Sequence, residues 1–572
     1  MPEDARPCFR VFLTPTRVLE ATHRLGPGVW YFGLTRGRRG TILLHQRWVC
    51  TPLFIDGVTA DHADANYGRL LRFRNTGGRW RQWAMPMALL GGSGEALREA
   101  LLGLGVEIDP DGRALLARYL QTGRPDHHLR CVTQAGWVEE TLYVTPTRVY
   151  APTSAQARGV IFQGESPAQS ERAVCGSLTT WQEGVAALAV NNPLLMLGLA
   201  AAFAGPLLRR CHAESGGLHF FGGSSTGKTT ILEVACSVWG GTSWRRSWRA
   251  TTNGLEGAAQ LCNDGLMVLD EIGECAPQEV GAIVYMLGNN VGKQRATRGG
   301  QARPIARFRT FVLSSGEQSL TTIIQEGGGR ARVGQGLRLL DLPVARPFGA
   351  WDCLHGFDSG TTFSDHLKRT AQGHFGHAGD AFLRRLVEER EDLAARFGRI
   401  ADMPAFSAAT LDGQERRGAA RFALIALAGE LAIAYGILPW AEGAALGAAV
   451  VGFDLWCGER GRGHQETRKV SEQLAEFVAR HGESRFSPLG ASGALVRDRA
   501  GWWRDEAEPT GRVYLFTSAG LREALRGWEF RQALQLLKEA GVINLDAGKA
   551  GVYRIGPRTV RLYAIKGNVL DC

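Results

Sequence analysis

Short runs of aromatic and β-branched residues alternate with turn-forming residues from about residue 28 to residue 150. The runs include VWYFGL, TILLHQRWV, LLRF and TLYV, and Gly, Asp and Arg dominate the turns between them. This alternation is typical of β-strands, and a single helical pattern lies at residues 95–104. We therefore expect an α+β domain, followed by a linker over residues 153–170, where Ser, Ala, Gln and Gly dominate.

In the middle of the chain, buried strands alternate with helical patterns. Asn192 and Pro193 form a cap and first-turn pair that predicts a helix over LLMLGLAAAFAGPLL. Apolar runs predict strands at residues 218–222, 266–270 and 308–314, and the pattern at 229–239 predicts a helix. Alternating strands and helices favour a parallel sheet with crossover helices, so the fold class is α/β.

The last third of the chain is helical before it returns to strands. Ala- and Leu-rich periods cover residues 365–482, two helical segments flank Gly527, and GVINL, GVYRI and RLYAI follow. Two helices before a short sheet are typical of a winged helix. We expect four domains: an N-terminal α+β domain with its linker (1–180), a P-loop core (181–350), a helical lid (351–485) and a winged-helix-like domain (486–572).

Composition and charge narrow the class of protein. The 572 residues are 44% apolar and 21% charged, as in globular proteins, and the formal charge of +10 favours a polyanionic partner. The 11 cysteines show no CxxC spacing, which argues for reduced thiols and against a zinc module or disulfide scaffold. His127, His128 and Cys131 come nearest to a metal cluster, but they lack a second half and are interpreted as surface residues.

Neither export nor membrane insertion is expected. The N-terminus carries acids and prolines where a signal peptide has a basic start and an apolar run. The two most apolar stretches, 193–208 and 422–438, are shorter than the roughly 20 residues that span a bilayer. We expect a cytoplasmic protein with no membrane partner.

The segment GGSSTGKT at residues 222–229 matches the P-loop pattern G-x-x-x-x-G-K-[ST], between a predicted strand and a predicted helix. Backbone N–H groups of such a loop wrap phosphates, and the helix N-terminus adds positive potential. Lys228 would neutralise β- and γ-phosphate oxygens, and Thr229 would offer its hydroxyl to Mg²⁺. The expected ATP-binding residues are Gly222, Gly223, Ser224, Ser225, Thr226, Gly227, Lys228, Thr229 and Thr230.

Two acids end the predicted strand LMVLDE. We expect Asp270, with Thr229, to hold the metal's coordination shell, and Glu271 to orient or deprotonate the attacking water. The strand FVLSSGE also ends in polar residues, and Ser314 or Ser315 is a candidate sensor of the γ-phosphate, with Ser314 preferred. A plain strand-end turn is the alternative.

Between these strands, the basic segment at residues 289–303 has Gly299 and Gly300 at its centre and resembles a β-hairpin. Lys293, Arg295 and Arg298 would present phosphate-binding charge to DNA, unless the segment is only a solvated basic loop.

Further on, Arg330, Arg332 and Arg338 lie on and after a Gly-rich loop that precedes an apolar strand. One of them, preferably Arg338, is expected to act in trans on the γ-phosphate held by a neighbouring subunit. A purely structural role for each is the alternative.

With these residues in view, the chain resembles the bacterial family called domain of unknown function 927, helicase-like proteins of phages, plasmids and other mobile elements. The resemblance rests on the helix at 192–208, HFFGGSSTGKTTILEVACSVWG, TTNGLEG, LMVLDEIGE, YMLGNNVGKQRA, LSSGE and RFALIALAGELAIAYGILPW. It implies an AAA+ ATPase related to minichromosome-maintenance and viral initiator helicases. Related helicases commonly have Asn at the sensor, where this chain has Ser314 and Ser315, and Arg417 or Arg421 is a candidate lid arginine.

The resemblance implies an ATP-dependent DNA helicase or translocase that serves replication of a mobile element. The expected partners are single-stranded or forked DNA and further copies of the chain in a ring, expected to be a hexamer; ATP and Mg²⁺ are the expected cofactors. The alternative is an ATP-dependent switch or protein-remodelling scaffold that binds DNA without unwinding it. Intact Glu271 favours turnover over passive switching.

Overall fold

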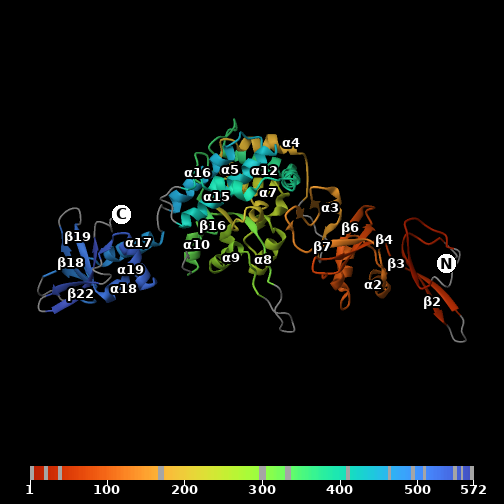
Figure 1. Ribbon diagram of the computed structural model, residues 1–572, viewed down its shortest axis with the longest axis horizontal. Coiled ribbons are helices and arrows are strands. Elements are labelled where there is room, and N and C mark those ends of the chain that lie inside the picture. Colours follow the sequence, from red (N-terminus) through yellow and green to blue (C-terminus); the bar gives the residue numbers. More distant parts are fainter. Residues whose placement is uncertain are drawn as a thin grey trace. The chain divides into compact units, whose positions relative to one another are not determined.

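The computed structural model describes most of the chain (Figure 1). The described residues are 6–18, 24–36, 42–164, 173–294, 305–328, 336–407, 413–460, 465–490, 496–506, 511–544, 550–555 and 558–566. Two compact units emerge from the contacts: residues 1–407 with 417–456, and residues 408–416 with 457–572.

The N-terminal part of the first unit has the α+β character that the alternating pattern predicts. An antiparallel sheet has the order β1–β2–β3, and a five-stranded sheet has the order β11–β7–β4–β5–β6. Helices α1 and α2 pack with Leu71, Phe73 and Trp83 in one core. The elements are β1 (Cys8–Phe12), β2 (Gly28–Arg36), β3 (Ile42–Cys50), β4 (Leu53–Ala60), β5 (Gly68–Arg74), β6 (Trp80–Pro86), α1 (Glu95–Gly103), α2 (Arg113–Thr122) and β7 (His128–Val132).

Part of the expected linker is regular structure, so this prediction was wrong where the structure describes it. Helix α3 (Ser154–Arg158) is followed by β11 (Val160–Phe162), which pairs in parallel with β7. Val160 is buried, which explains why three apolar residues in polar surroundings join a sheet. Residues 165–172 lie outside the described part.

A small antiparallel sheet, of β8 (Gly136–Val138), β9 (Leu142–Val144) and β10 (Val149–Tyr150), joins the N-terminal part to the core. The Trp137 indole donates to the Pro206 carbonyl at 2.7 Å, and the Tyr143 hydroxyl donates to the Asp264 carbonyl at 2.7 Å. Both donors are buried, so these bonds tie the sheet firmly to the segments around the core.

The core of the first unit is a parallel five-stranded sheet with the order β13–β14–β15–β12–β16, as the alternation of strands and helices predicts. Since all its strands point the same way, their carboxyl ends meet at one edge. The strands are β12 (Gly216–Phe221), β13 (Arg245–Ser247), β14 (Gly265–Asp270), β15 (Thr310–Gly316) and β16 (Leu339–Pro343).

Helices cover this sheet. The predicted helix after Asn192 begins at Pro193 but ends at Ala202, because Pro206 has no N–H to donate to the Ala202 carbonyl. Gly205 lies against the backbone of Gly265, where a Cβ would come within 2.3 Å. The covering helices are α4 (Leu178–Trp181), α5 (Pro193–Ala202), α6 (Leu207–Arg210), α7 (Lys228–Ser237), α8 (Thr252–Leu261), α9 (Pro277–Asn289) and α10 (Leu320–Glu326).

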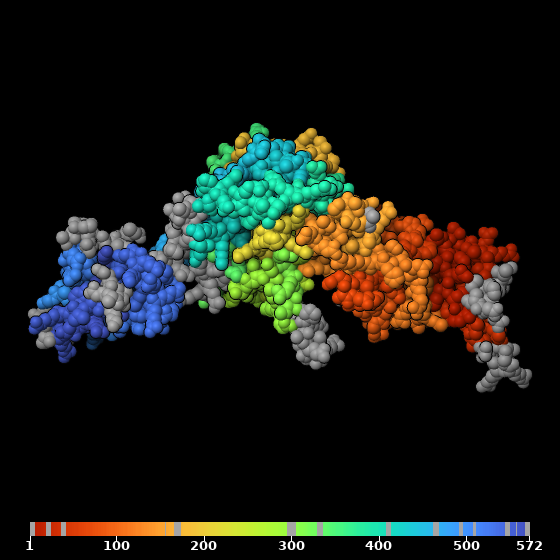
Figure 2. Space-filling model, viewed as in Figure 1, coloured from red at the N-terminus to blue at the C-terminus, as the bar shows by residue number. Residues whose placement is uncertain are grey.

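After the sheet, the chain forms the expected helical layer, which covers the core as teal and cyan residues in Figure 2. Its helices are α12 (Gly360–Gly373), α13 (His377–Leu386), α14 (Leu393–Ala401), α15 (Gly413–Ala434) and α16 (Ala444–Arg460). No helix in the described ranges is long and apolar enough to cross a bilayer.

The second unit contains the two helices and the strands that the C-terminal pattern predicts, together with α17 and three earlier strands. Its sheet has the order β17–β18–β19–β22–β20, with β21 paired to β22. Val470, Leu474 and Val478 of α17 share a core with Leu521 and Leu537. The elements are α17 (Gln465–His481), β17 (Phe486–Pro488), β18 (Gly501–Asp505), β19 (Arg512–Phe516), α18 (Ser518–Ala524), α19 (Phe530–Glu539), β20 (Ile543–Asn544), β21 (Gly551–Ile555) and β22 (Arg558–Lys566).

Candidate nucleotide-binding site

The loop at residues 222–227 connects β12 to the first turn of α7. Gly222 has φ +146° and Gly227 has φ +100°, values that side chains rarely tolerate. A Cβ at Gly227 would also lie 2.8 Å from Cζ2 of Trp351. The loop therefore needs glycine at both ends to bring its backbone N–H groups around one point before α7.

Lys228 is buried inside this loop. Its Nζ donates to the Gly222 carbonyl at 2.8 Å and to the Gly223 carbonyl at 2.5 Å. Desolvation lowers the pKa of Lys228, and the nearby carboxylates of Glu271, Glu317 and Asp270 oppose this shift. The ammonium group thus lies among loop carbonyls with three acids around it.

Asp270, at the end of β14, connects the loop helix to the acidic strand. Its Oδ1 accepts hydrogen bonds from Thr229 Oγ1 at 3.3 Å and from the Ser315 hydroxyl. Its Oδ2 accepts from Arg245 Nη1 at 2.8 Å, and the same Nη1 lies 3.1 Å from Glu233 Oε1 on α7. Thr229 and Asp270, the two expected metal-binding residues, therefore lie together.

Glu271 follows in a left-handed backbone conformation, with φ +56°. Its backbone N–H donates to Ser315 Oγ at 3.1 Å. Because this conformation is uncommon for a non-glycine residue, the hydrogen bond helps to hold Glu271 where its carboxylate lies near Lys228. Ser315 thus contacts both acids of the pair.

Ser314 has different partners. Trp248 Nε1 donates to Ser314 Oγ at 2.9 Å, and Ser314 Oγ lies 2.9 Å from His219 Nδ1. Burial lowers the pKa of His219 to about 4, so the ring is neutral at pH 7. Its Nε2 donates to the Gln318 carbonyl at 3.0 Å, so Nδ1 must accept from the Ser314 hydroxyl. Trp248, Ser314 and His219 are all buried.

Behind the loop lie Trp351 and Ser364, to which no sequence motif pointed. Trp351 lies against Gly227, and its indole donates to Ser364 Oγ at 3.0 Å. Asn192 does not cap α5 with its side chain; its Oδ1 accepts from the backbone N–H groups of residues 352 and 353, at 2.8 and 3.0 Å. The start of α5 is thereby tied to the segment behind the P-loop.

The arginines expected at the γ-phosphate are distributed unevenly. Arg330 and Arg332 lie outside the described residues. Arg338 Nε donates to Asn289 Oδ1 at 3.0 Å, and its guanidinium lies 4.5 Å from the Tyr285 ring centroid. The Arg338 carbonyl accepts from Gly217 N, five residues before Gly222, so Arg338 is about 17 Å from its own P-loop along β12.

Arg421, a candidate lid arginine, also lies at the amino ends of the strands. Its Nη2 donates to the Ser215 carbonyl at 3.0 Å, and its Nη1 donates to the Leu337 carbonyl. The side chain is buried, which lowers its pKa to about 10. Arg421 therefore joins the starts of β12 and β16, away from the P-loop.

The flanks of the expected basic hairpin pair as antiparallel strands do. Gly292 N donates to the Ala306 carbonyl at 2.8 Å, and Phe308 N donates to the Asn290 carbonyl at 3.1 Å. Lys293 N donates to Oε2 of Glu256, a buried residue of α8, at 3.3 Å. Arg295 and Arg298 lie outside the described residues.

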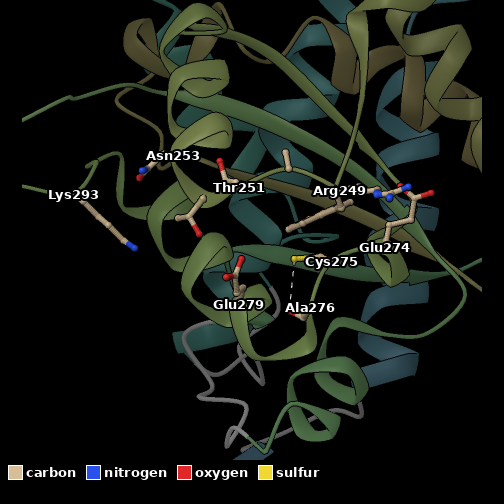
Figure 3. A pocket seen from close by; sticks show the side chains of 11 residues that line it. Arg249, Thr251, Asn253, Glu274, Cys275, Ala276, Glu279 and Lys293 are labelled. Carbon is tan, nitrogen blue, oxygen red and sulfur yellow. Dashed lines mark hydrogen bonds between the residues drawn. The ribbon is translucent and has the colours of Figure 1, made fainter.

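A pocket of about 550 Å³ opens beside this base, at the N-termini of α8 and α9 (Figure 3). Lys293 and Asn253 lie at one end of it, and Arg249 and Glu274 at the other (Figure 3). Glu279 also lines it, so its charge is mixed. In the described ranges no group of three or more His, Cys, Asp or Glu side chains could hold a metal ion, here or elsewhere.

Among solved structures, the chain is similar to one described as "SCCmec type IV Cch - active helicase". The TM-score is 0.67 and the identity 16%, over 95% of this chain and 98% of that chain. This likeness shows a shared mixed α/β fold.

Two other matches have TM-scores too low to carry an argument. The crystal structure of NtrX from Brucella abortus in complex with ATP matches at a TM-score of 0.18, with 19% identity over 26% of this chain and 36% of that one. The apo C-terminal region of NrS-1 matches at 0.27, with 9% identity over 59% and 67%.

No curated protein matches the chain. The model of the family described as domain of unknown function (DUF927) matches residues 22–307, half of the chain. The protein therefore belongs to the DUF927 family.

Proposed function

We propose that the protein is an ATP-dependent DNA helicase or translocase of a mobile genetic element, working as a homo-oligomeric ring. One observation carries the proposal: Lys228, Thr229, Asp270 and Glu271 converge at the carboxyl edge of a parallel sheet. This arrangement is what phosphoryl transfer to water requires, because its catalysis rests on positioning and charge. Membership of the DUF927 family and the fold likeness to a helicase support DNA as the substrate.

The strand order supports assigning the core to the AAA+ type. Strand β15 lies between the P-loop strand β12 and the acidic strand β14, so its carboxyl end faces both. The helical layer α12–α16 then takes the place of the lid, and α18, α19 and the following strands that of the winged helix. The divisions at residues 180 and 350 belong to the same proposal. The expected division at residue 485 is moved to before α17, because α17 shares its core with the second unit.

The residues present fit ATP with Mg²⁺. A hydroxyl and a carboxylate oxygen 3.3 Å apart are hard donors of the kind that Mg²⁺ prefers, and Mg²⁺ needs few protein ligands when phosphates supply others. When bound, the metal would neutralise charge on the phosphate oxygens. The loop N–H groups from Gly222 to Thr230 would bind the phosphates, with Lys228 released from its carbonyls to reach them.

Glu271 would orient the attacking water and accept its proton. Ser315, which contacts the N–H of Glu271 and the carboxylate of Asp270, fits the sensor position better than Ser314. We therefore propose Ser315, rather than Ser314, as the sensor of the γ-phosphate.

DNA would meet the protein at the hairpin whose base is paired at residues 290–292 and 306–308. Lys293 is exposed there, and Arg295 and Arg298 would extend the basic arm. The second candidate, an ATP-dependent switch or protein-remodelling scaffold that binds DNA without unwinding, uses the same ATPase site.

A combined assay tests the proposal. The full chain is given ATP, Mg²⁺ and a labelled fork, and ATP hydrolysis and strand separation are measured together, with Lys228→Ala as the inactive control. Strand separation that depends on Lys228 is expected, with hydrolysis about 100-fold or more below the parent in the variant. Hydrolysis without strand separation on any fork polarity would favour the switch or scaffold, and electron microscopy of the same sample with a nonhydrolysable analogue shows whether a ring encloses DNA.

A further inference from the structure

The hairpin formed by β5 and β6 in the N-terminal part is rich in arginine. Residues 68–86 contain five arginines and no acid. Two antiparallel strands carry them, with Arg72 opposite Gln82 and Arg74 opposite Trp80. The arginines are Arg69, Arg72, Arg74, Arg79 and Arg81. This concentration of one charge on a single hairpin is unlike the balanced composition of the whole chain.

The two faces of the hairpin differ. Leu71, Phe73 and Trp83 point into the core with α1 and α2. Because side chains alternate along a strand, Arg72 and Trp80 point away from that core. Phe54 of β4 lies opposite Arg72 in the sheet and joins them on this face.

On this outer face, Arg72 lies between two aromatic rings. Its guanidinium carbon is 4.7 Å from the Phe54 ring centroid and 5.1 Å from the Trp80 ring centroid. Asp56 accepts from Arg72 at 2.6 and 3.2 Å, which holds the guanidinium in place. Trp80 is 46% exposed, and every other tryptophan in the described ranges is buried or half-buried. The stack therefore presents a rigid, accessible indole.

Exposed positive charge flanks the stack. Arg74 and Arg79 are exposed beside it, whereas Arg81, which pairs with Phe73, points to the other face of the hairpin by the same alternation. Arg74 Nε donates to the Gly78 carbonyl at 3.0 Å, and Arg79 N donates to Asn75 Oδ1 at 2.8 Å, so both lie on an ordered turn. Asp56 compensates Arg72 only, and the other charges complement a polyanion.

We propose that this hairpin, residues 68–86, is a binding surface for single-stranded DNA. An unpaired base stacks on Trp80, and Arg74 and Arg79 contact the flanking phosphates. A duplex hides its base faces, whereas every unpaired base offers one to an aromatic ring. The proposal goes beyond the ATPase and rests on the proposed function only in naming DNA as the polyanion; binding here requires neither ATP nor a ring.

Fluorescence anisotropy of labelled oligothymidine with the full chain, without nucleotide and over a range of salt, tests this surface. Trp80→Ala is expected to weaken binding about 5-fold or more, and Trp80→Phe to restore part of the loss. The Arg74→Ala, Arg79→Ala double variant is expected to reduce the salt slope by about 1. Tyr67→Ala is the matched control, since Tyr67 is 47% exposed in the same domain; basal ATP hydrolysis and thermal unfolding check that each variant is folded.

Parent-like affinity and salt slope in both the Trp80→Ala and the Arg74→Ala, Arg79→Ala variants would overturn the proposal. An equal loss of affinity for blunt duplex DNA would also overturn it, because the surface would then not select unpaired bases. Variants that lose affinity for an acidic polyglutamate peptide but keep their affinity for oligothymidine would overturn it as well, because the surface would then bind a protein. Lys228→Ala is expected to bind oligothymidine like the parent. If the parent protein does not unwind DNA but Trp80→Ala still weakens oligothymidine binding, the proposed motor function is refuted and the binding surface is not.

Discussion

Ser314 and Ser315 are adjacent residues with different partners, and this allows their roles to be separated. Ser315→Ala removes the acceptor of Glu271 N–H and a donor to Asp270, so we expect ATP turnover to fall about 10-fold with little loss of stability. Ser314→Ala leaves the Trp248 indole N–H and His219 Nδ1 without this partner, and is expected to cost about 1–3 kcal/mol of unfolding free energy. Turnover and urea denaturation of both variants measure this. If the two variants lost turnover and unfolding free energy to the same extent, the two serines would not have separate roles.

Glu271 gives a second test at this scale. Glu271→Gln keeps the shape of the side chain but loses the carboxylate, so ATP binding is expected to persist while hydrolysis falls about 100-fold or more. Nucleotide affinity is measured by titration and turnover by phosphate release. A variant that hydrolyses ATP at the parent rate would remove Glu271 from catalysis.

His219 predicts a pH dependence of stability. Its folded pKa of about 4 lies below its ordinary value of 6.5, so the unfolded state takes up a proton first as the pH falls. Stability is therefore present above about pH 6.5 and is lost between pH 6.5 and 4, by roughly 3 kcal/mol at most. Urea denaturation at pH 7.5 and 5 of the parent and His219→Gln measures it, and an equal loss in both proteins would assign the dependence to other groups.

The residues of the candidate site that directly follow a strand could be predicted from the sequence. The P-loop and the acids follow apolar strands, and parallel strands bring such ends together. Arg245 was not predictable, because β13 has three residues, two of them arginines, and no apolar pattern. The partners of Asn192 lie 160 and 161 residues away, beyond any local signal.

At the scale of elements, the expected basic hairpin, whose base is paired at residues 290–292 and 306–308, carries the prediction about DNA. Replacing Lys293, Arg295 and Arg298 with Ala removes phosphate contacts, so DNA-stimulated hydrolysis is expected to fall while basal hydrolysis survives. Glu256, which accepts from Lys293 N, is kept unchanged so that the base stays paired. Hydrolysis with and without single-stranded DNA measures the effect, and full stimulation in the triple variant would exclude the hairpin as the motor's DNA contact.

The elements themselves were mostly predictable from period and length. Core strands β12, β14 and β15 and the helices α1, α18 and α19 follow clear patterns. Strand β11 did not, because its three apolar residues join the sheet through pairing with β7. The interruption after Ala202 was readable from Pro206, whereas the close approach of Gly205 to Gly265 was not.

At the scale of the whole molecule, Arg338 predicts cooperation between subunits. It lies at the amino end of β16, about 17 Å from its own P-loop, so it can reach a γ-phosphate only in a neighbouring subunit. Mixing Lys228→Ala with Arg338→Ala subunits is expected to restore hydrolysis, because one interface then has an intact P-loop and an intact arginine. Mixing Lys228→Ala with Glu271→Gln is the matched control, since both changes fall on the P-loop side. If none of the Arg338→Ala, Arg332→Ala and Arg330→Ala variants restored hydrolysis when mixed with Lys228→Ala, this result would argue against an arginine that acts in trans.

The second unit sets where a truncation can end. Because α17 shares its core with α18 and α19, a truncation that removes these two helices should also remove α17, which begins at Gln465, whereas a cut after Ser487 would leave α17 without that core. Exposed Val470 and Leu474 would then favour aggregation.

The hydrogen bonds from Asn192 to residues 352 and 353 also determine which fragment can serve as an isolated ATPase. A recombinant piece that started at the P-loop strand would lack Asn192, and one that stopped at the end of β16 would lack Trp351 behind Gly227. Either piece would leave the glycine turn without its backing, although every motif residue was present. The smallest useful expression fragment therefore begins before Asn192 and continues past Ser364, the partner of Trp351.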